Sequence, residues 1–108
     1  MTEDEARSAL HARLEELDQL DALSEEGREP VTLQQDSVGR LSRMDAMQQQ
    51  AMAQAEERRR TAERARIRAA LARLDEGEWG HCAGCGEDIA EGRLRNDPSV
   101  ARCVGCAG

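Results

Sequence analysis

Aromatic side chains are almost absent from this chain: its 108 residues include one Trp, Trp79, and no Phe or Tyr. β-Sandwiches and barrels depend on aromatic and β-branched residues, so an all-β fold is disfavoured. The apolar carbon comes mostly from Ala and Leu, which suit helices that pack along a narrow strip. Because 34% of the residues are charged, the chain cannot build a large central core. We therefore predict a mostly α-helical protein of about one domain.

The charges are unevenly distributed along the chain. Residues 1–26 hold nine acidic residues and two arginines, whereas residues 54–75 hold four acidic residues and seven arginines. The formal net charge of the whole chain is −7, and all 15 basic residues are Arg. An acidic segment and a later basic segment indicate two helices that lie side by side and compensate each other.

The first predicted helix runs from about Asp4 to Ser24. Thr2 is its expected N-cap, and Gly27 is the expected stop signal. Helical spacing predicts one apolar face on this helix, made by Ala6, Leu10, Leu14, Leu17, Leu20 and Leu23.

The second predicted helix begins near Thr32, Asp36 or Ser37 and ends near Leu74. Its apolar face is predicted from residues at steps of three to four or their multiples: Val38, Leu41, Met44, Met47, Ala51, Ala55, Ala62, Ala69 and Leu74. The expected fold is an antiparallel helical hairpin, or coiled coil, over residues 1–78 with its tip near 25–45. A small four-cysteine zinc finger follows over residues 79–108.

The four cysteines carry the strongest chemical signal. They form two C-x2-C pairs, Cys82/Cys85 and Cys103/Cys106, separated by 17 residues. Each two-residue gap lets one tight turn direct two sulfurs at the same ion, as in a four-thiolate zinc site. Glycines inside the turns allow backbone N–H groups to approach the sulfurs and offset their negative charge. The spacing therefore predicts one structural Zn²⁺.

Other interpretations of the cysteines and their neighbours are weaker. Disulfides are disfavoured in a reducing compartment, and iron–sulfur clusters usually need other spacings. His81 could replace one ligand, although a surface position is expected because the cysteine set is complete. Trp79 is expected to pack where the long helix meets the finger.

The segment from Gly80 to Cys106 resembles the DksA/TraR family of bacterial RNA polymerase regulators. The residues that carry the resemblance are Cys82, Cys85, Gly86, Ile89, Arg93, Leu94, Pro98, Cys103 and Cys106. The preceding Gly77-Glu78-Trp79-Gly80 is similar to the family's junction between helix and finger, and the hairpin-then-finger layout is also similar.

The resemblance implies a protein that binds RNA polymerase rather than DNA. In the family, the coiled-coil tip enters the secondary channel and approaches the active site, and some members act jointly with ppGpp. The family's tip motif is Asp-x-x-Asp-x-Ala; here Asp36 matches its first residue, while Gly39 and Leu41 replace the other two. Asp45-Ala46 is a looser candidate. The resemblance thus implies a partner-binding role at the tip for Asp36 and, more loosely, for Asp45. Arg40 and Arg43 are added as candidates because they would give the tip region a charge that faces the polymerase.

Each of these residues also has a structural interpretation. Asp36 could cap the second helix, and Arg40, Arg43 and Asp45 could be solvated. The arginines between 58 and 68 could grip an acidic partner or a polyphosphate nucleotide. We favour intrahelical pairing of those arginines with Glu56, Glu57 and Glu63.

Two other functional classes are weighed against a polymerase regulator. The alternative is a small zinc-finger module that binds nucleic acid or protein without polymerase activity, but the net charge of −3 over residues 76–108 disfavours nucleic acid. An enzyme is not expected, because four thiolates leave no open zinc position and no nucleophile–base set is present. No membrane span is expected, and the cytoplasm is the expected location.

Overall fold

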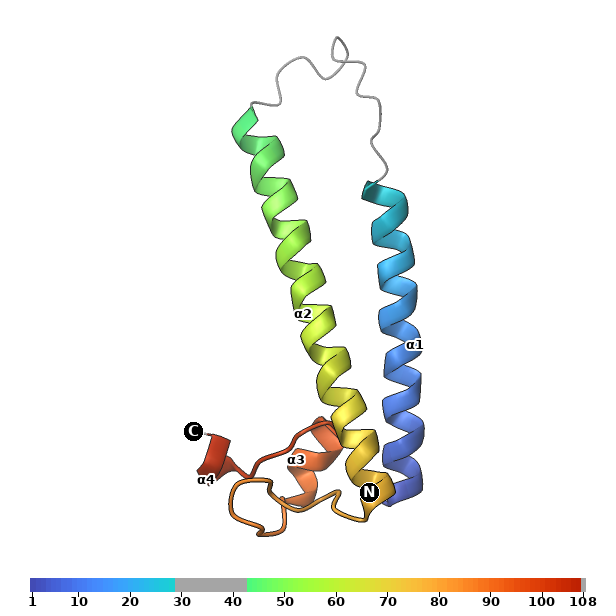
Figure 1. Ribbon diagram of the computed structural model, residues 1–108, viewed down its shortest axis with the longest axis vertical. Coiled ribbons are helices and arrows are strands. Elements are labelled where there is room, and N and C mark those ends of the chain that lie inside the picture. The colour runs from blue at the N-terminus through green and yellow to red at the C-terminus, as the bar shows by residue number, and fades with distance from the viewer. Residues whose placement is uncertain (29–42, 108) are drawn as a thin grey trace.

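The computed structural model describes residues 1–28 and 43–107. Two long helices, α1 (Glu3–Arg28) and α2 (Arg43–Glu76), lie antiparallel, and two short helices follow, α3 (Glu91–Asn96) and α4 (Val104–Ala107). Figure 1 shows both long helices rising from one end of the molecule, where the cysteine-containing segment is also found. We call this end the base of the hairpin. None of the helices within the described ranges has the length and hydropathy that a membrane span requires.

Helix α1 begins where the sequence predicts and ends later. The Thr2 hydroxyl oxygen accepts a hydrogen bond from the Glu5 backbone N–H at 3.1 Å, which confirms Thr2 as the N-cap. The predicted end at Ser24 is wrong, because the helix continues through Gly27 to Arg28. A single glycine costs a helix only about 1 kcal/mol, so it does not end one by itself.

Helix α2 ends in a Schellman motif. The Gly77 N–H donates to the Leu74 carbonyl and the Glu78 N–H donates to the Arg73 carbonyl, at 3.3 and 2.8 Å. Gly77 has a φ of +74°, which is the left-handed conformation that this motif requires. The end at Glu76 lies two residues beyond the prediction, whereas the predicted start near Thr32 to Ser37 falls outside the described residues.

The contact between α1 and α2 is narrower than predicted. Ala6, Leu10 and Leu17 of α1 are buried, and the buried residues of α2 are Ile67, Ala70 and Leu74. Leu14 and Ala55 are half-buried, and Val38 and Leu41 lie outside the described residues. The other predicted contact residues are exposed: Leu20, Leu23, Met44, Met47, Ala51, Ala62 and Ala69. The two helix axes lie closer together at the base than at the far end (Figure 1), so only the residues near the base are buried.

Beyond Leu17, charged side chains join the two helices. Arg60 Nε lies 2.7 Å from Asp21 Oδ1, and Arg64 pairs with both Asp18 and Asp21. Nearer the base, Arg13 Nε lies 2.6 Å from Glu63 Oε2. These pairs confirm that the acidic first segment and the basic later segment compensate each other across the hairpin.

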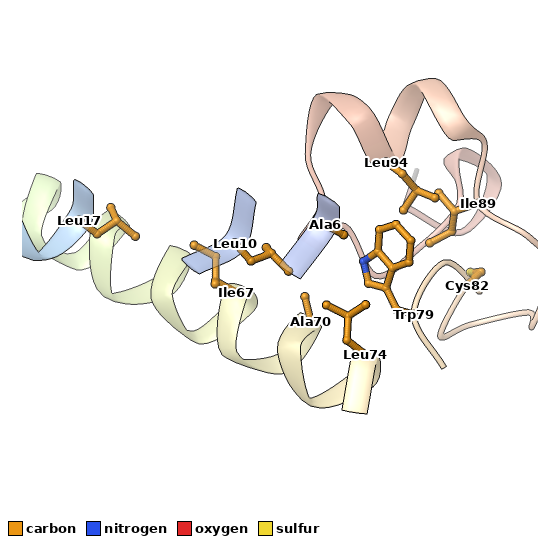
Figure 2. Close-up of a cluster of buried hydrophobic side chains, with 10 residues drawn as sticks. All are labelled: Ala6, Leu10, Leu17, Ile67, Ala70, Leu74, Trp79, Cys82, Ile89 and Leu94. Carbon is orange, nitrogen blue, oxygen red and sulfur yellow. The ribbon is translucent and has the colours of Figure 1, made fainter. Parts of the chain in front are cut away.

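The buried core lies at the base, where both long helices meet the finger. Trp79 is 8% exposed, and its indole N–H donates to the Pro98 carbonyl at 3.0 Å. Figure 2 shows the indole next to Leu74 of α2, and Ile89 and Leu94 beyond it. The expected structural role of Trp79 at this junction is thus confirmed, and its packing fixes the finger against the hairpin.

Candidate metal centre

The first cysteine pair lies in a tight loop that follows Trp79. The Cys82 N–H donates to the Glu87 carbonyl at 2.7 Å, and the Gly86 N–H donates back to the Cys82 carbonyl at 2.9 Å. Gly86 has a φ of +78°, a conformation that residues with a Cβ rarely adopt. The glycine after Cys85 therefore lets the chain close the loop around the two sulfurs.

The second pair spans the start of α4. Cys103 immediately precedes this helix, and its carbonyl accepts hydrogen bonds from Cys106 and Ala107 at 3.1 and 2.9 Å. The two cysteine loops are joined by the Ala83 N–H, which donates to the Ala101 carbonyl at 2.7 Å. Residues about 20 positions apart are thus brought against each other by backbone contacts.

The four sulfur atoms form one cluster, all lying within 4.8 Å of one another. All four cysteines are free, and the Sγ atoms of Cys85 and Cys103 are 3.7 Å apart, far longer than a disulfide bond. A tetrahedral zinc with Zn–S bonds of about 2.3 Å places its sulfurs about 3.8 Å apart. The arrangement therefore fits one zinc ion held by thiolates, and one structural zinc is the cofactor of this segment.

The backbone and the neighbouring sulfurs act on the thiols in opposite directions. Backbone N–H groups of Cys103, Cys85 and Gly84 lower the pKa of Cys82 to about 6. The sulfurs of Cys103, Cys82 and Cys85 instead raise the pKa of Cys106 to about 12. Four clustered thiolates thus require a cation to offset their mutual repulsion, which a divalent metal ion supplies.

Gly84 lies close to two of the sulfurs. Its N–H donates to the Cys82 sulfur at 3.3 Å, as the sequence predicts for a glycine inside the turn. A Cβ at this position would lie 3.2 Å from the Cys106 sulfur. The absence of a side chain therefore allows the two cysteine loops to approach each other closely.

His81 lies outside the sulfur cluster. Its Nδ1 is 2.9 Å from a carboxylate oxygen of Asp88, with which it also forms an antiparallel backbone bridge. The cluster of metal-binding groups found in the described residues contains only the four cysteines. His81 is thus placed at the surface, as the favoured interpretation holds.

Several contacts that support the finger could not be read from cysteine spacing. Arg93 Nε donates to the Arg102 carbonyl at 2.9 Å, which connects α3 to the second cysteine loop. Asp97 accepts hydrogen bonds from the backbone and hydroxyl of Ser99 at 3.0 and 2.6 Å. The only sequence signal for the second contact is the Asp-Pro-Ser segment, which is typical of a turn.

Two of the predicted tip residues, Arg43 and Asp45, are far from the metal centre. Arg43 and Asp45 lie exposed in the first turn of α2, at the end opposite the finger. Asp36 and Arg40, with the motif that contains them, lie outside the described residues. The 31 helical steps from Asp45 to Glu76 correspond to about 45 Å at 1.5 Å per residue.

Residues 77–108 match the family model described as the prokaryotic dksA/traR C4-type zinc finger. The C-terminal segment is a zinc finger of the dksA/traR type. The match includes the Schellman glycine, Trp79 and both cysteine pairs, and it confirms the resemblance noted from the sequence. No curated protein sequence matched the chain.

The whole chain is also similar in fold to a solved structure, that of transcription factor DksA2 from Pseudomonas aeruginosa. The two share 21% sequence identity with a TM-score of 0.74, over 97% of this chain and 79% of that chain. The similarity shows a common fold: a long helical hairpin joined to a dksA/traR-type finger.

Proposed function

We propose that this protein regulates transcription by binding RNA polymerase directly through the secondary channel, with the tip of the hairpin near the polymerase active site. In this proposal the finger is a structural base, and Cys82, Cys85, Cys103 and Cys106 hold its single zinc ion. Arg43 and Asp45, together with Asp36 and Arg40, are proposed to contact the polymerase. Joint action with ppGpp on the polymerase is part of the same proposal.

The proposal is supported chiefly by the combination of a dksA/traR-type finger with a hairpin of DksA2-like fold. A finger alone occurs in many kinds of protein, and a helical hairpin alone carries no functional information. Their combination over 97% of the chain favours a polymerase regulator over an unrelated zinc module.

The geometry of the chain suits this mode of action. The Schellman motif at Gly77 and the buried Trp79 leave no loose linker between α2 and the finger. A finger resting on the outside of a partner would therefore position residues about 45 Å away along α2. Such a rod can place Asp45 deep inside a channel without any movement within the protein.

The zinc itself is proposed to have no catalytic role. Four thiolates fill a tetrahedral coordination sphere and leave no position for water or substrate. The ion then acts by holding two loops together, so the protein would influence a reaction that another protein carries out.

Binding to core RNA polymerase tests the proposal directly. We expect micromolar or tighter binding that is reversed by a second factor known to occupy the secondary channel. No binding at micromolar protein, or binding that such a factor does not reverse, would contradict the proposed site.

Transcription in vitro from a ribosomal promoter, with and without ppGpp, tests the tip. We expect Asp45→Asn and Asp36→Asn to reduce the effect on transcription while polymerase binding changes by less than about fivefold, because most single residues of an interface contribute less than about 1 kcal/mol to its affinity. Asp4→Asn, at the base end of the hairpin, is the matched control and should behave as the wild type.

A further inference from the structure

Helix α2 has a second apolar face that α1 does not cover. We call it the outer face of α2, defined by two adjoining sets of residues. A shallow groove of about 510 Å³ is lined by Gln54, Glu57, Arg58, Thr61, Ala62 and Ala65. A second groove, of about 260 Å³, lies nearer the start of α2 and is lined by Met44, Met47, Gln48 and Ala51.

This face points away from the hairpin contact. Arg58 is nine residues from the buried Ile67, which is about 180° around an α-helix. Met44 and Met47 are 69% and 66% exposed, although methionine side chains are normally covered. A surface with large exposed apolar side chains at helical spacing is typical of a site that another helix covers.

Two exposed arginines, Arg58 and Arg68, lie at the outer face, and the groove also contains one acidic residue, Glu57. Neither arginine forms an ion pair with another residue in the described ranges. The expected pairing within α2 does not occur for Glu63, which pairs with Arg13 of α1 instead. Free arginines beside an apolar groove favour an acidic partner.

We propose that the outer face of α2 is a docking surface for an acidic amphipathic helix of another protein. The apolar side of that helix would lie against Met47, Ala51 and Ala62, where small residues allow the helix axes to approach closely. Its flanking carboxylates would pair with Arg58 and Arg68. The outer face begins beside the tip residues Arg43 and Asp45 and extends along α2 to Ala65, so the inference adds a second partner to the proposed function.

Two other occupants fit the surface less well. A second copy docking through its own outer face would bring like-charged arginines together. The large apolar side chains that α1 exposes, Leu20 and Leu23, span only one turn, which is much shorter than the outer face. Nucleic acid would be attracted by the arginines but would leave the methionines unused, and the chain carries a net charge of −7.

A synthetic peptide provides the first test. The probe is an acidic amphipathic helix of about three heptads with two Leu and flanking Glu residues in each. Its binding to the full zinc-loaded chain is measured by isothermal titration calorimetry. The control peptide has Lys in place of every Glu. We expect the acidic peptide to bind at least 10-fold more tightly than the control, and less tightly as salt is raised. Equal binding of the two peptides would overturn the proposal.

Variants of the chain locate the surface. Ala62→Glu should abolish binding of the acidic peptide, and Arg58→Glu combined with Arg68→Glu should weaken it by at least about 10-fold. Ala12→Glu, at an exposed position of α1, is the matched control and should bind as the wild type. Unchanged binding by Ala62→Glu, or equal loss by Ala12→Glu, would show that the peptide does not bind at the outer face.

Further measurements distinguish the other occupants and the two proposals. Sedimentation that shows a dimer not dissociated by the peptide would favour a second copy, and tighter binding of single-stranded RNA than of the acidic peptide would favour nucleic acid; either result would overturn the inference. Loss of polymerase binding with retained peptide binding would contradict only the proposed function. Loss of peptide binding with retained polymerase binding would contradict only the docking surface.

Discussion

At the scale of single residues, glycine determines how closely the finger can close around its metal. Gly86 adopts a φ of +78°, and Gly84 leaves room for the Cys106 sulfur. Gly86 is needed for its backbone conformation, whereas Gly84 is needed because a side chain would crowd the Cys106 sulfur. Gly92 in α3 has neither constraint, because a Cβ there would meet nothing within 4 Å.

Gly86→Ala should therefore destabilise the finger by about 1–2 kcal/mol, the cost of a left-handed conformation for a residue with a Cβ. Gly92→Ala is the matched control and should raise stability by about 0.5–1 kcal/mol, because alanine favours a helix. Thermal unfolding of the zinc-loaded proteins measures both effects. Equal stability of the two variants would mean that the left-handed conformation at Gly86 is not required.

At the scale of elements, apolar contacts join α1 and α2 near the base, and ion pairs join them farther along. The last buried apolar residue of α1 is Leu17, and beyond it Arg60 and Arg64 of α2 both pair with Asp21 of α1. The hydrogen bond from Arg60, together with Arg64, lowers the pKa of the Asp21 carboxyl. The ionised form of Asp21 therefore stabilises the folded hairpin.

The sign of the resulting pH dependence follows from that shift. Because the folded pKa of Asp21 lies below its unfolded value, its stabilising contribution is present above about pH 4 and is lost as the pH falls through the folded pKa. Asp21→Asn should thus have a lower Tm than the wild type at pH 7. The Tm difference should shrink below about pH 4 and also in high salt at pH 7. Equal Tm values at pH 7 would show that the Arg60–Asp21–Arg64 cluster does not stabilise the hairpin.

The helices also show how far the sequence could predict this fold. Cysteine spacing, the Thr2 cap and the opposite charges of the two segments were sufficient for the metal centre and the pairing of α1 with α2. For the buried face of α2 the prediction was right at Leu74 and wrong at Met47, Ala51 and Ala62. These three residues form an apolar face as regular as that of Ile67, Ala70 and Leu74. Periodicity alone does not indicate which of two apolar faces a partner covers.

The side-chain pairing could not be predicted for a related reason. An arginine on α2 has acidic residues within reach both three or four positions away and on α1. Glu63 and Arg64 pair across the hairpin, a choice that depends on the rotation of α2 about its axis. That rotation follows from the packing of Ile67 and Leu74, which the sequence did not identify together.

At the scale of the whole molecule, the finger and the hairpin share one small core. Trp79, Ile89 and Leu94 pack with Leu74 and Ala6, so the zinc-binding segment contributes part of the apolar surface that holds the two long helices together at the base. Arg73 of α2 adds hydrogen bonds to the carbonyls of Ser99 and Val100. The metal is therefore expected to stabilise more than the loops that bind it.

Removal of zinc by a chelator should unfold residues 77–107 and also weaken the hairpin at its base. Amide hydrogen exchange is the appropriate measurement, because it reports on each segment separately. We expect protection to be lost in the finger and reduced in the last turns of α2, and to return when one equivalent of Zn²⁺ is added. Unchanged protection in the metal-free protein would contradict a structural role for the ion.

The burial of Trp79 has one practical consequence. Since the chain contains no Tyr and no other Trp, its near-ultraviolet absorption and intrinsic fluorescence come from a single indole. That indole lies where α1, α2 and the finger meet, with its N–H bonded to the Pro98 carbonyl. The emission spectrum of the unlabelled protein thus reports on the contact between the hairpin and the finger. Separation of the two parts can be followed in real time without a dye.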